Sequence, residues 1–308
     1  AVGRLALSTN TTTNNNTAVG YAAMQSNTTG TENTAVGKSA LNAGTTGSYN
    51  TAVGTGAMQA GTVTGNKNDA FGFNAGHNIS TGTSNTCIGT QTMDSLTTGN
   101  YNVAIGVAAL QSIGDDSNNV AVGYRALYNS TVSNNTAVGR DALYANTTGA
   151  YNVAVGTNAL YADTTGDSNT AVGYQAAYNC TTGAANVMLG DYAGHGLTTA
   201  SRCVFIGNTA GYSGSTTGDK NTAIGDNSCR ELTSGSQNTA MGSESLFVVT
   251  TGNNNVAIGK GAGRALTTGG QNVFIGESAG LDVTTGSNNV LLGQDTGRGA
   301  PSGQITTG

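Results

Sequence analysis

The sequence predicts an all-β protein, a parallel β-solenoid or β-roll of about eighteen coils with about 17 residues each. A short phrase recurs along nearly the whole chain: Asn, then Thr or Val, then typically Ala, then Val or Ile, then Gly. The glycines that close this phrase, called anchors below, keep a nearly constant spacing with only three small exceptions. The 308 residues also include 48 glycines but one proline, and only 9 % are charged. This register indicates stacked copies of one unit.

The repeat covers residues 1–300, and the chain departs from the pattern over residues 301–308. We expect one repetitive shaft followed by a short off-pattern tail, with no separate catalytic domain. The anchors are Gly3, Gly20, Gly37, Gly54, Gly72, Gly89, Gly106, Gly123, Gly139, Gly156, Gly173, Gly190, Gly207, Gly225, Gly242, Gly259, Gly276 and Gly293.

The three residues before each anchor have the alternation of a short strand. The residue directly before the anchor is large and apolar, and the residue three before it is Thr or Val, with Asp69 as the exception. These two flanking positions point to the same side of the strand, and we expect them to face the inside of the coil. The middle position between them then points outward.

The middle position is usually Ala and is never polar. A strand that is apolar on both sides is generally buried on both sides. Because one coil offers no second layer, we expect the middle side chains to be covered by another copy of the chain. The predicted interface residues are Ala35, Ala52, Cys87, Met188, Phe205, Phe274 and Leu291.

The residue four before the anchor is Asn in sixteen of the seventeen complete coils, and Cys203 is the exception. Stacked Asn amides can bond one another and the backbone at a corner. The anchor allows a backbone with positive φ, and a Thr-Thr-Gly turn usually ends ten residues after it. Each coil therefore holds either two short strands or one strand and a tight loop.

The position five after the anchor, called the ladder position, is aromatic or cationic over the second half of the repeat. A row of aromatic faces can stack on sugar rings, and Arg adds planar hydrogen bonding, which favours a glycan-binding strip. Alternatively, the rings stack on one another and pack coil on coil, or they fill the space between copies of the chain. The candidate residues are Tyr128, Tyr144, Tyr161, Tyr178, His195, Tyr212, Arg230 and Phe247. Tyr49, Tyr101 and Tyr151, five before their anchors, are interpreted as scattered surface tyrosines.

Composition argues against several other classes of function. The net charge is −5 with only 11 Lys and Arg residues, which does not fit a nucleic-acid partner. The sequence has no run of 18 apolar residues, so we expect no membrane insertion. His77 and His195 are seven coils apart, and the four cysteines occupy four different positions of the repeat. We therefore expect no metal site, no cofactor, no catalytic residues and no enzymatic activity.

The phrases Asn33–Gly37 and Asn152–Gly156, each followed by Ala-Leu and later Thr-Thr-Gly, resemble the repeat region of phage tail fibres. They are also similar to the β-roll heads of trimeric autotransporter adhesins, although the period of those heads is shorter. The resemblance covers nearly the whole chain. It implies a homotrimer displayed outside the cell, on a virion tail or a bacterial surface, with a host-surface glycan or receptor as partner.

Three functional hypotheses follow. The first is a structural and adhesive fibre, a rigid trimeric shaft for attachment with weak glycan contacts along the ladder position. The second is a bacterial extracellular adhesin or filament subunit whose copies stack end to end through open strand edges. The third is an ice-binding solenoid, which would need Thr columns on a flat outer face. The Thr column at the flanking position is expected inside the coil, and this speaks against the third hypothesis.

Overall fold

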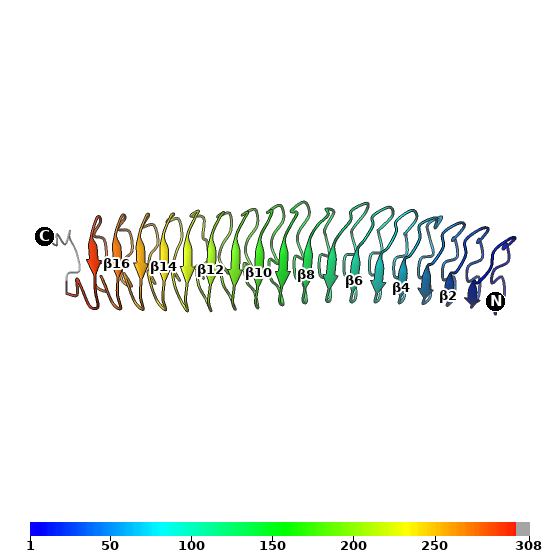
Figure 1. The fold of residues 1–308 in the computed structure, drawn as a ribbon, viewed down its shortest axis with the longest axis horizontal. Helices are drawn as coiled ribbons and strands as arrows, with labels where there is room; N and C mark the ends of the chain where they lie inside the picture. Colours follow the sequence, from blue (N-terminus) through cyan, green and yellow to red (C-terminus); the bar gives the residue numbers. More distant parts are fainter. Residues whose placement is uncertain (300–308) are drawn as a thin grey trace. The chain divides into compact units, whose positions relative to one another are not determined.

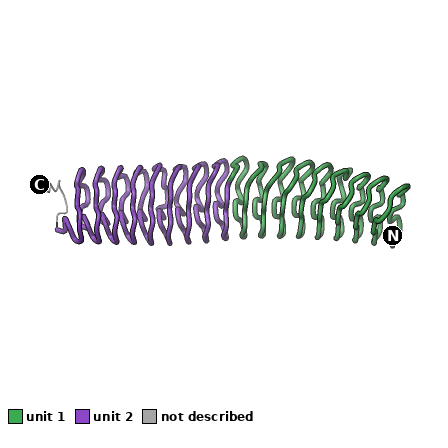
Figure 2. The backbone as a smooth tube through the Cα atoms, viewed as in Figure 1, with its two compact units in different colours: residues 1–151 green, residues 152–308 purple. Residues whose placement is uncertain are grey.

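The computed structural model describes residues 1–299, so the predicted off-pattern tail at 301–308 lies outside the described residues. Over the described range the chain forms seventeen strands of three residues each and no helix. It divides into two compact units, residues 1–151 and residues 152–308 (Figure 2). The predicted all-β parallel solenoid, including the predicted coil length, is therefore confirmed.

Each unit repeats one strand per coil (Figure 1). The strands of unit 1 are β1 (Thr17–Val19), β2 (Thr34–Val36), β3 (Thr51–Val53), β4 (Asp69–Phe71), β5 (Thr86–Ile88), β6 (Val103–Ile105), β7 (Val120–Val122) and β8 (Thr136–Val138). The strands of unit 2 are β9 (Val153–Val155), β10 (Thr170–Val172), β11 (Val187–Leu189), β12 (Val204–Ile206), β13 (Thr222–Ile224), β14 (Thr239–Met241), β15 (Val256–Ile258), β16 (Val273–Ile275) and β17 (Val290–Leu292).

Within each unit, every strand pairs in parallel with the next, and equivalent residues of the two coils are partners. Thr34 pairs with Thr51 in unit 1, for example, and Val256 pairs with Val273 in unit 2. Each position of the repeat therefore forms a column of side chains across the coils. The first anchor differs from the others, because Val2 makes only an isolated parallel bridge to Val19 instead of a strand.

Outside the strands the coils consist mainly of turns and bends, with isolated bridges such as Gly44 to Val63 and Leu197 to Thr216. The alternative with one strand and a tight loop is therefore the correct one. The anchor must be glycine for two reasons, as Gly20 illustrates. Its φ is +131°, and a Cβ there would lie 2.5 Å from the carbonyl oxygen of Gly37 in the next coil. The loop after the anchor then curls through alternate left-handed residues, such as Ser39 and Leu41 with φ of 58° and 48°.

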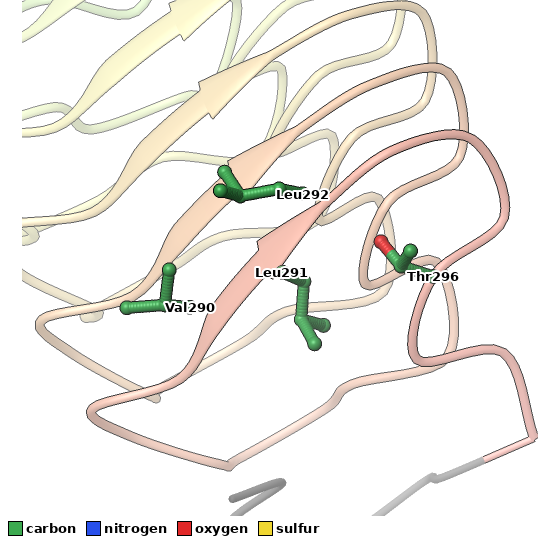
Figure 3. Close-up of a pocket in the computed structure, with 4 residues that line it drawn as sticks. All are labelled: Val290, Leu291, Leu292 and Thr296. Atoms are coloured by element: carbon green, nitrogen blue, oxygen red, sulfur yellow. The ribbon is translucent and has the colours of Figure 1, made fainter. Parts of the chain in front are cut away.

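The expected orientation of the strands is wrong. The seven residues predicted to form an interface between copies, Ala35, Ala52, Cys87, Met188, Phe205, Phe274 and Leu291, are buried inside their own coils. The flanking positions face outward and are half-exposed instead. Figure 3 shows this alternation on β17, where Val290 and Leu292 point to one side of the strand and Leu291 to the other.

The physical reason is the narrowness of the coil. Opposite the strand, Ala40 and Leu41 are both buried and occupy most of the interior, which leaves room for one small side chain from β2. The residue four after the anchor, Leu41 in this coil, faces the middle residue of the strand. Where the middle residue is bulky, as Phe205 is, this facing residue is glycine. A Cβ on Gly211 would lie 2.5 Å from the ring of Phe205, so the ring occupies the space that a side chain would need. Two branched side chains per strand cannot fit inside such a coil.

The predicted Asn ladder is confirmed. The side-chain amide of Asn33 donates to the carbonyl oxygen of Gly47 at 2.8 Å, and its Oδ1 accepts the backbone N–H of Asn50 at 2.8 Å. The same pair of bonds recurs in unit 2, where Asn238 donates to Gly252 and accepts from Asn255. These bonds satisfy buried backbone groups at the corner before each strand.

Candidate functional site

The ladder position lies in the loop after the anchor, directly behind a buried residue with left-handed backbone, such as Leu143 before Tyr144 or Leu160 before Tyr161. Because this geometry repeats in every coil, the following side chains project in the same direction. All eight candidate residues are half-buried. The structure therefore places them in one column within each unit, as the sequence predicted.

The rings in this column stack face to face. In unit 1 the ring centroids of Tyr128 and Tyr144 are 5.4 Å apart with an interplanar angle of 19°. In unit 2 the centroids of Tyr161 and Tyr178 are 5.1 Å apart at 4°. His195 continues the stack at 5.4 Å from Tyr178 and 5.2 Å from Tyr212. Burial lowers the pKa of His195 below its usual value, which favours a neutral ring at pH 7.

Two arginines extend the stack of unit 2 by cation–π contacts. The guanidinium carbon of Arg230 lies 5.6 Å from the ring centroid of Tyr212 and 5.5 Å from that of Phe247. The guanidinium carbon of Arg264 lies 5.2 Å from the ring centroid of Phe247. Arg230 and Arg264 also form ion pairs with Glu231 at 3.0 Å and Glu244 at 2.8 Å. Both charges are therefore compensated locally.

The face-to-face stacking limits what the ladder can bind. A sugar ring stacks on the face of an aromatic ring, but here each face inside the stack is covered by the next rung. Only ring edges, hydroxyl groups and the compensated arginines face the solvent. The geometry thus favours the alternative in which the rings pack coil on coil, and it leaves little open aromatic face for a glycan.

A second aromatic group lies beside the ladder of unit 2 and was not singled out from the sequence. Tyr192 meets Tyr174 edge to face at 5.2 Å and 83°, and it meets Tyr212 at 6.0 Å and 74°. Desolvation and the neighbouring tyrosines raise the pKa of Tyr192. The positions one and two after the anchor vary from coil to coil, so the repeat gave no signal for this group.

Unit 1 has a comparable cluster built on charge. The buried carboxylate of Asp141 accepts from Arg125 Nε at 2.8 Å and from Arg140 Nε at 3.2 Å. The guanidinium carbon of Arg125 lies 4.8 Å from the ring centroids of both Tyr124 and Tyr144. The hydrogen bond to Asp141 raises the pKa of Arg125. A carboxylate held between two arginines in this way is a structural ion pair network.

The four cysteines are free and buried. Burial raises the pKa of Cys87 and of Cys229 to about 12, and that of Cys203 to about 11. Thiols in this state are poor nucleophiles and poor metal ligands. Across residues 1–299, no three His, Cys, Asp or Glu side chains come together in a way that could hold a metal ion.

No protein-family model matches this sequence, and no curated protein is similar to it at a significant level. A search of the described residues for a helix long and apolar enough to span a membrane found none.

Proposed function

We propose that this chain is the shaft of a homotrimeric fibre for attachment to a host or another surface. The observation that supports the proposal is the outer stripe, defined as the column of residues directly before the anchors. Every member of this column in β1–β17 is Val, Ile, Leu, Met or Phe, and all of them point outward. Val36, Ile88 and Ile258, for instance, are 36–39 % exposed.

A single exposed apolar side chain is common on protein surfaces, but an unbroken column of them is not. Contact with other copies would remove this apolar area from water, at roughly 25 cal/mol for each Å² buried. The outer stripe repeats with every coil, so two copies aligned in parallel can match it along each unit. The number of three copies comes from the resemblance to tail fibres and autotransporter heads.

The ladder supports the same proposal. Its stacked rings and cation–π contacts hold neighbouring coils together within each unit, which is what a stiff shaft needs. Ala, Leu, Met and Phe side chains fill the interior of the described coils, and such a packed interior supports the proposal of a shaft.

The experiment compares two charged substitutions by light scattering coupled to gel filtration. Ile105→Glu places a charge in the outer stripe, and Val107→Glu places one on an apolar residue outside it. The two side chains are similarly exposed, at 38 % and 46 %. We expect Ile105→Glu to reduce the assembly to smaller species while Val107→Glu leaves it unchanged. Equal behaviour of both variants would contradict the proposed interface.

One observation favours a second candidate, an ice-binding surface. The expectation that the Thr column lies inside the coil is wrong, because Thr34, Thr51 and Thr86 face outward beside the outer stripe. Regularly spaced Thr and Val on a flat sheet are what that hypothesis requires. A thermal hysteresis assay separates the two candidates, since a fibre shaft shows no hysteresis and an ice-binding surface loses it on Thr51→Lys substitution.

A further inference from the structure

Three tyrosines of unit 1 occupy the corner position, defined as the residue five before an anchor. Tyr49, Tyr101 and Tyr151 are 53 %, 65 % and 65 % exposed, which makes them among the most exposed large side chains of the unit. They are not scattered, because they recur at every third coil of the same column. With parallel coils about 4.8 Å apart, neighbouring tyrosines in this column are separated by about 14 Å.

The backbone has the same conformation at all three tyrosines. The φ angles of Tyr49, Tyr101 and Tyr151 are 61°, 58° and 61°, which is a left-handed conformation shared by the whole corner column. The N–H of Tyr49 donates to Thr31 at 3.1 Å, and the N–H of Tyr101 donates to Thr83 at 3.1 Å, both in the preceding coil. None of the three rings stacks on another ring of the described chain. Because more than half of each tyrosine is exposed and no other ring covers it, its aromatic face is accessible, in contrast to the faces inside the ladder.

The coils between the tyrosines carry polar side chains at the same corner. These are Lys67, Ser84, Asn118 and Asn134, each with the same left-handed backbone. Lys67, Asn118 and Asn134 are exposed. Hydroxyl, amide and ammonium groups of this kind donate to and accept from alcohol groups. The column thus alternates one open aromatic face with two polar side chains, and it contains one formal charge.

We propose that this corner column, Tyr49 to Tyr151, binds an extended, uncharged linear polysaccharide lying along the coils. The sugar rings of such a chain repeat at nearly the spacing of the coils. Every third sugar can then place its apolar C–H face on a tyrosine, and the two sugars between can bond to the polar side chains. Each contact is weak, and three on one chain act together through their effective concentration.

This inference goes beyond the proposed shaft and does not depend on it. The corner column and the outer stripe are different positions of the repeat, so a monomer or a trimer can present the corner. The tests are also separate, because assembly is measured by mass and polysaccharide binding by retardation. A trimer that is not retarded overturns the polysaccharide site alone, and a monomer that is retarded overturns the proposed assembly alone.

The experiment is native affinity electrophoresis of the whole chain in gels that contain hydroxyethylcellulose or glucomannan. Both are extended β-1,4-linked chains, and flexible α-1,6-linked dextran serves as the polysaccharide control. We expect retardation in the first two gels and none in dextran. Retardation in none of the gels, or equal retardation in all three, overturns the proposal.

Variants then assign the site. Tyr101→Asn introduces the residue that Asn118 and Asn134 already provide at this corner, so the fold is retained. We expect it to weaken binding about three- to tenfold, as the loss of one aromatic contact implies. The triple variant Tyr49→Asn, Tyr101→Asn, Tyr151→Asn should abolish retardation.

The matched control is Phe73→Thr, which removes an aromatic ring that is 51 % exposed one residue after an anchor in the same unit. Thr occurs at that position in Thr55 and Thr90. This variant should bind as the wild type does. If the triple variant is retarded as strongly as the wild type, or if Phe73→Thr loses as much binding, the corner column is not the site.

Discussion

Asp163 is the buried carboxyl with the least complete set of hydrogen bonds. Its Oδ1 accepts the N–H of Gly166 at 2.9 Å, but its Oδ2 has no hydrogen-bond partner. In unit 1 the equivalent residue is Asn146, which accepts the N–H of Gly149 and also donates to its carbonyl oxygen at 2.8 Å. Burial raises the pKa of Asp163 to about 7.

We predict that Asp163→Asn stabilises unit 2 and that the gain grows with pH. Below pH 3.8, the pKa of the carboxyl in the unfolded state, the carboxyl is protonated in the folded and the unfolded protein alike. Its ionisation then does not change the free energy of unfolding. As pH rises toward 7 only the unfolded state ionises, which lowers the free energy of unfolding by up to about 4 kcal/mol. The substitution removes this loss, and its new amide can donate to Gly166 as Asn146 does to Gly149.

Denaturant unfolding at pH 4 and pH 8 measures the effect. The variant should gain clearly more relative to the wild type at pH 8 than at pH 4. Asp295→Asn, which removes an exposed carboxyl of the same unit, is the control substitution. Equal stability of Asp163→Asn and the wild type at pH 8 would show that the carboxyl is not buried as described.

Cys203 is the one break in the Asn ladder. The backbone N–H of Cys203 donates to Asn186 Oδ1 at 2.8 Å, as in other coils. The N–H groups of Asn221, however, find the sulfur of Cys203 in place of an amide oxygen, and sulfur is a weak acceptor. We predict that Cys203→Asn restores the ladder and stabilises the protein by about 1 kcal/mol. The midpoint of denaturant unfolding should rise, and the reverse exchange Asn238→Cys should lower it. A fall on Cys203→Asn would refute the ladder's role here.

The coil around β12 shows how an element adjusts to a bulky interior side chain. The ring of Phe205 lies against Gly211 and Gly194, where added Cβ atoms would approach it to 2.5 Å and 3.1 Å. Six other coils combine a middle Ala with a facing Leu, as Ala154 and Leu160 do. In the coil of β12 the ring of Phe205 thus occupies the place that the Leu side chain fills in those coils.

We predict a strong coupling between these two positions. Gly211→Leu alone should destabilise by several kcal/mol because the side chain collides with Phe205, and Phe205→Ala alone should cost about 3–5 kcal/mol through a cavity. The double variant should be more stable than either single variant, because it recreates the Ala–Leu pair. A double-mutant cycle by denaturant unfolding measures the coupling, and additive effects would contradict the packing described here.

The period, the strand before each anchor and the Asn ladder could all be predicted from the sequence, because each depends on a residue type that recurs in every coil. The direction of the strand could not, because both sides of a strand such as Val187–Leu189 are apolar. The sequence did contain an indication of this direction, because Gly194, Gly211 and Gly280 stand opposite the bulky residues Met188, Phe205 and Phe274. Only a side chain pointing inward needs such compensation.

The ladder column was also predicted from its recurrence. Whether the rings turn their faces or their edges to the solvent depends on how rings such as Tyr161, Tyr178 and His195 are oriented toward one another. The residue types alone do not determine that orientation. The corner tyrosines showed the opposite problem. Their three-coil recurrence was visible in the sequence, but their open faces follow only from the exposure and left-handed backbone seen in the structure.

At the scale of the proposed assembly, the two fibre hypotheses share the outer stripe and differ in where the fibre is found. Electron micrographs that show the chain on tailed particles would favour a phage fibre, and indefinite fibrils would favour a filament subunit stacked end to end. Both cases require the copies to associate first through the outer stripe.

Sedimentation equilibrium of the unsubstituted 308-residue chain tests that association most directly. The proposed trimer predicts a species with three times the mass of one chain, which is 30.5 kDa, and this species should be stable on dilution. A single species with the mass of one chain at all concentrations would show that water alone covers Val36, Ile88 and Ile105, and the account of a self-associating shaft would be wrong.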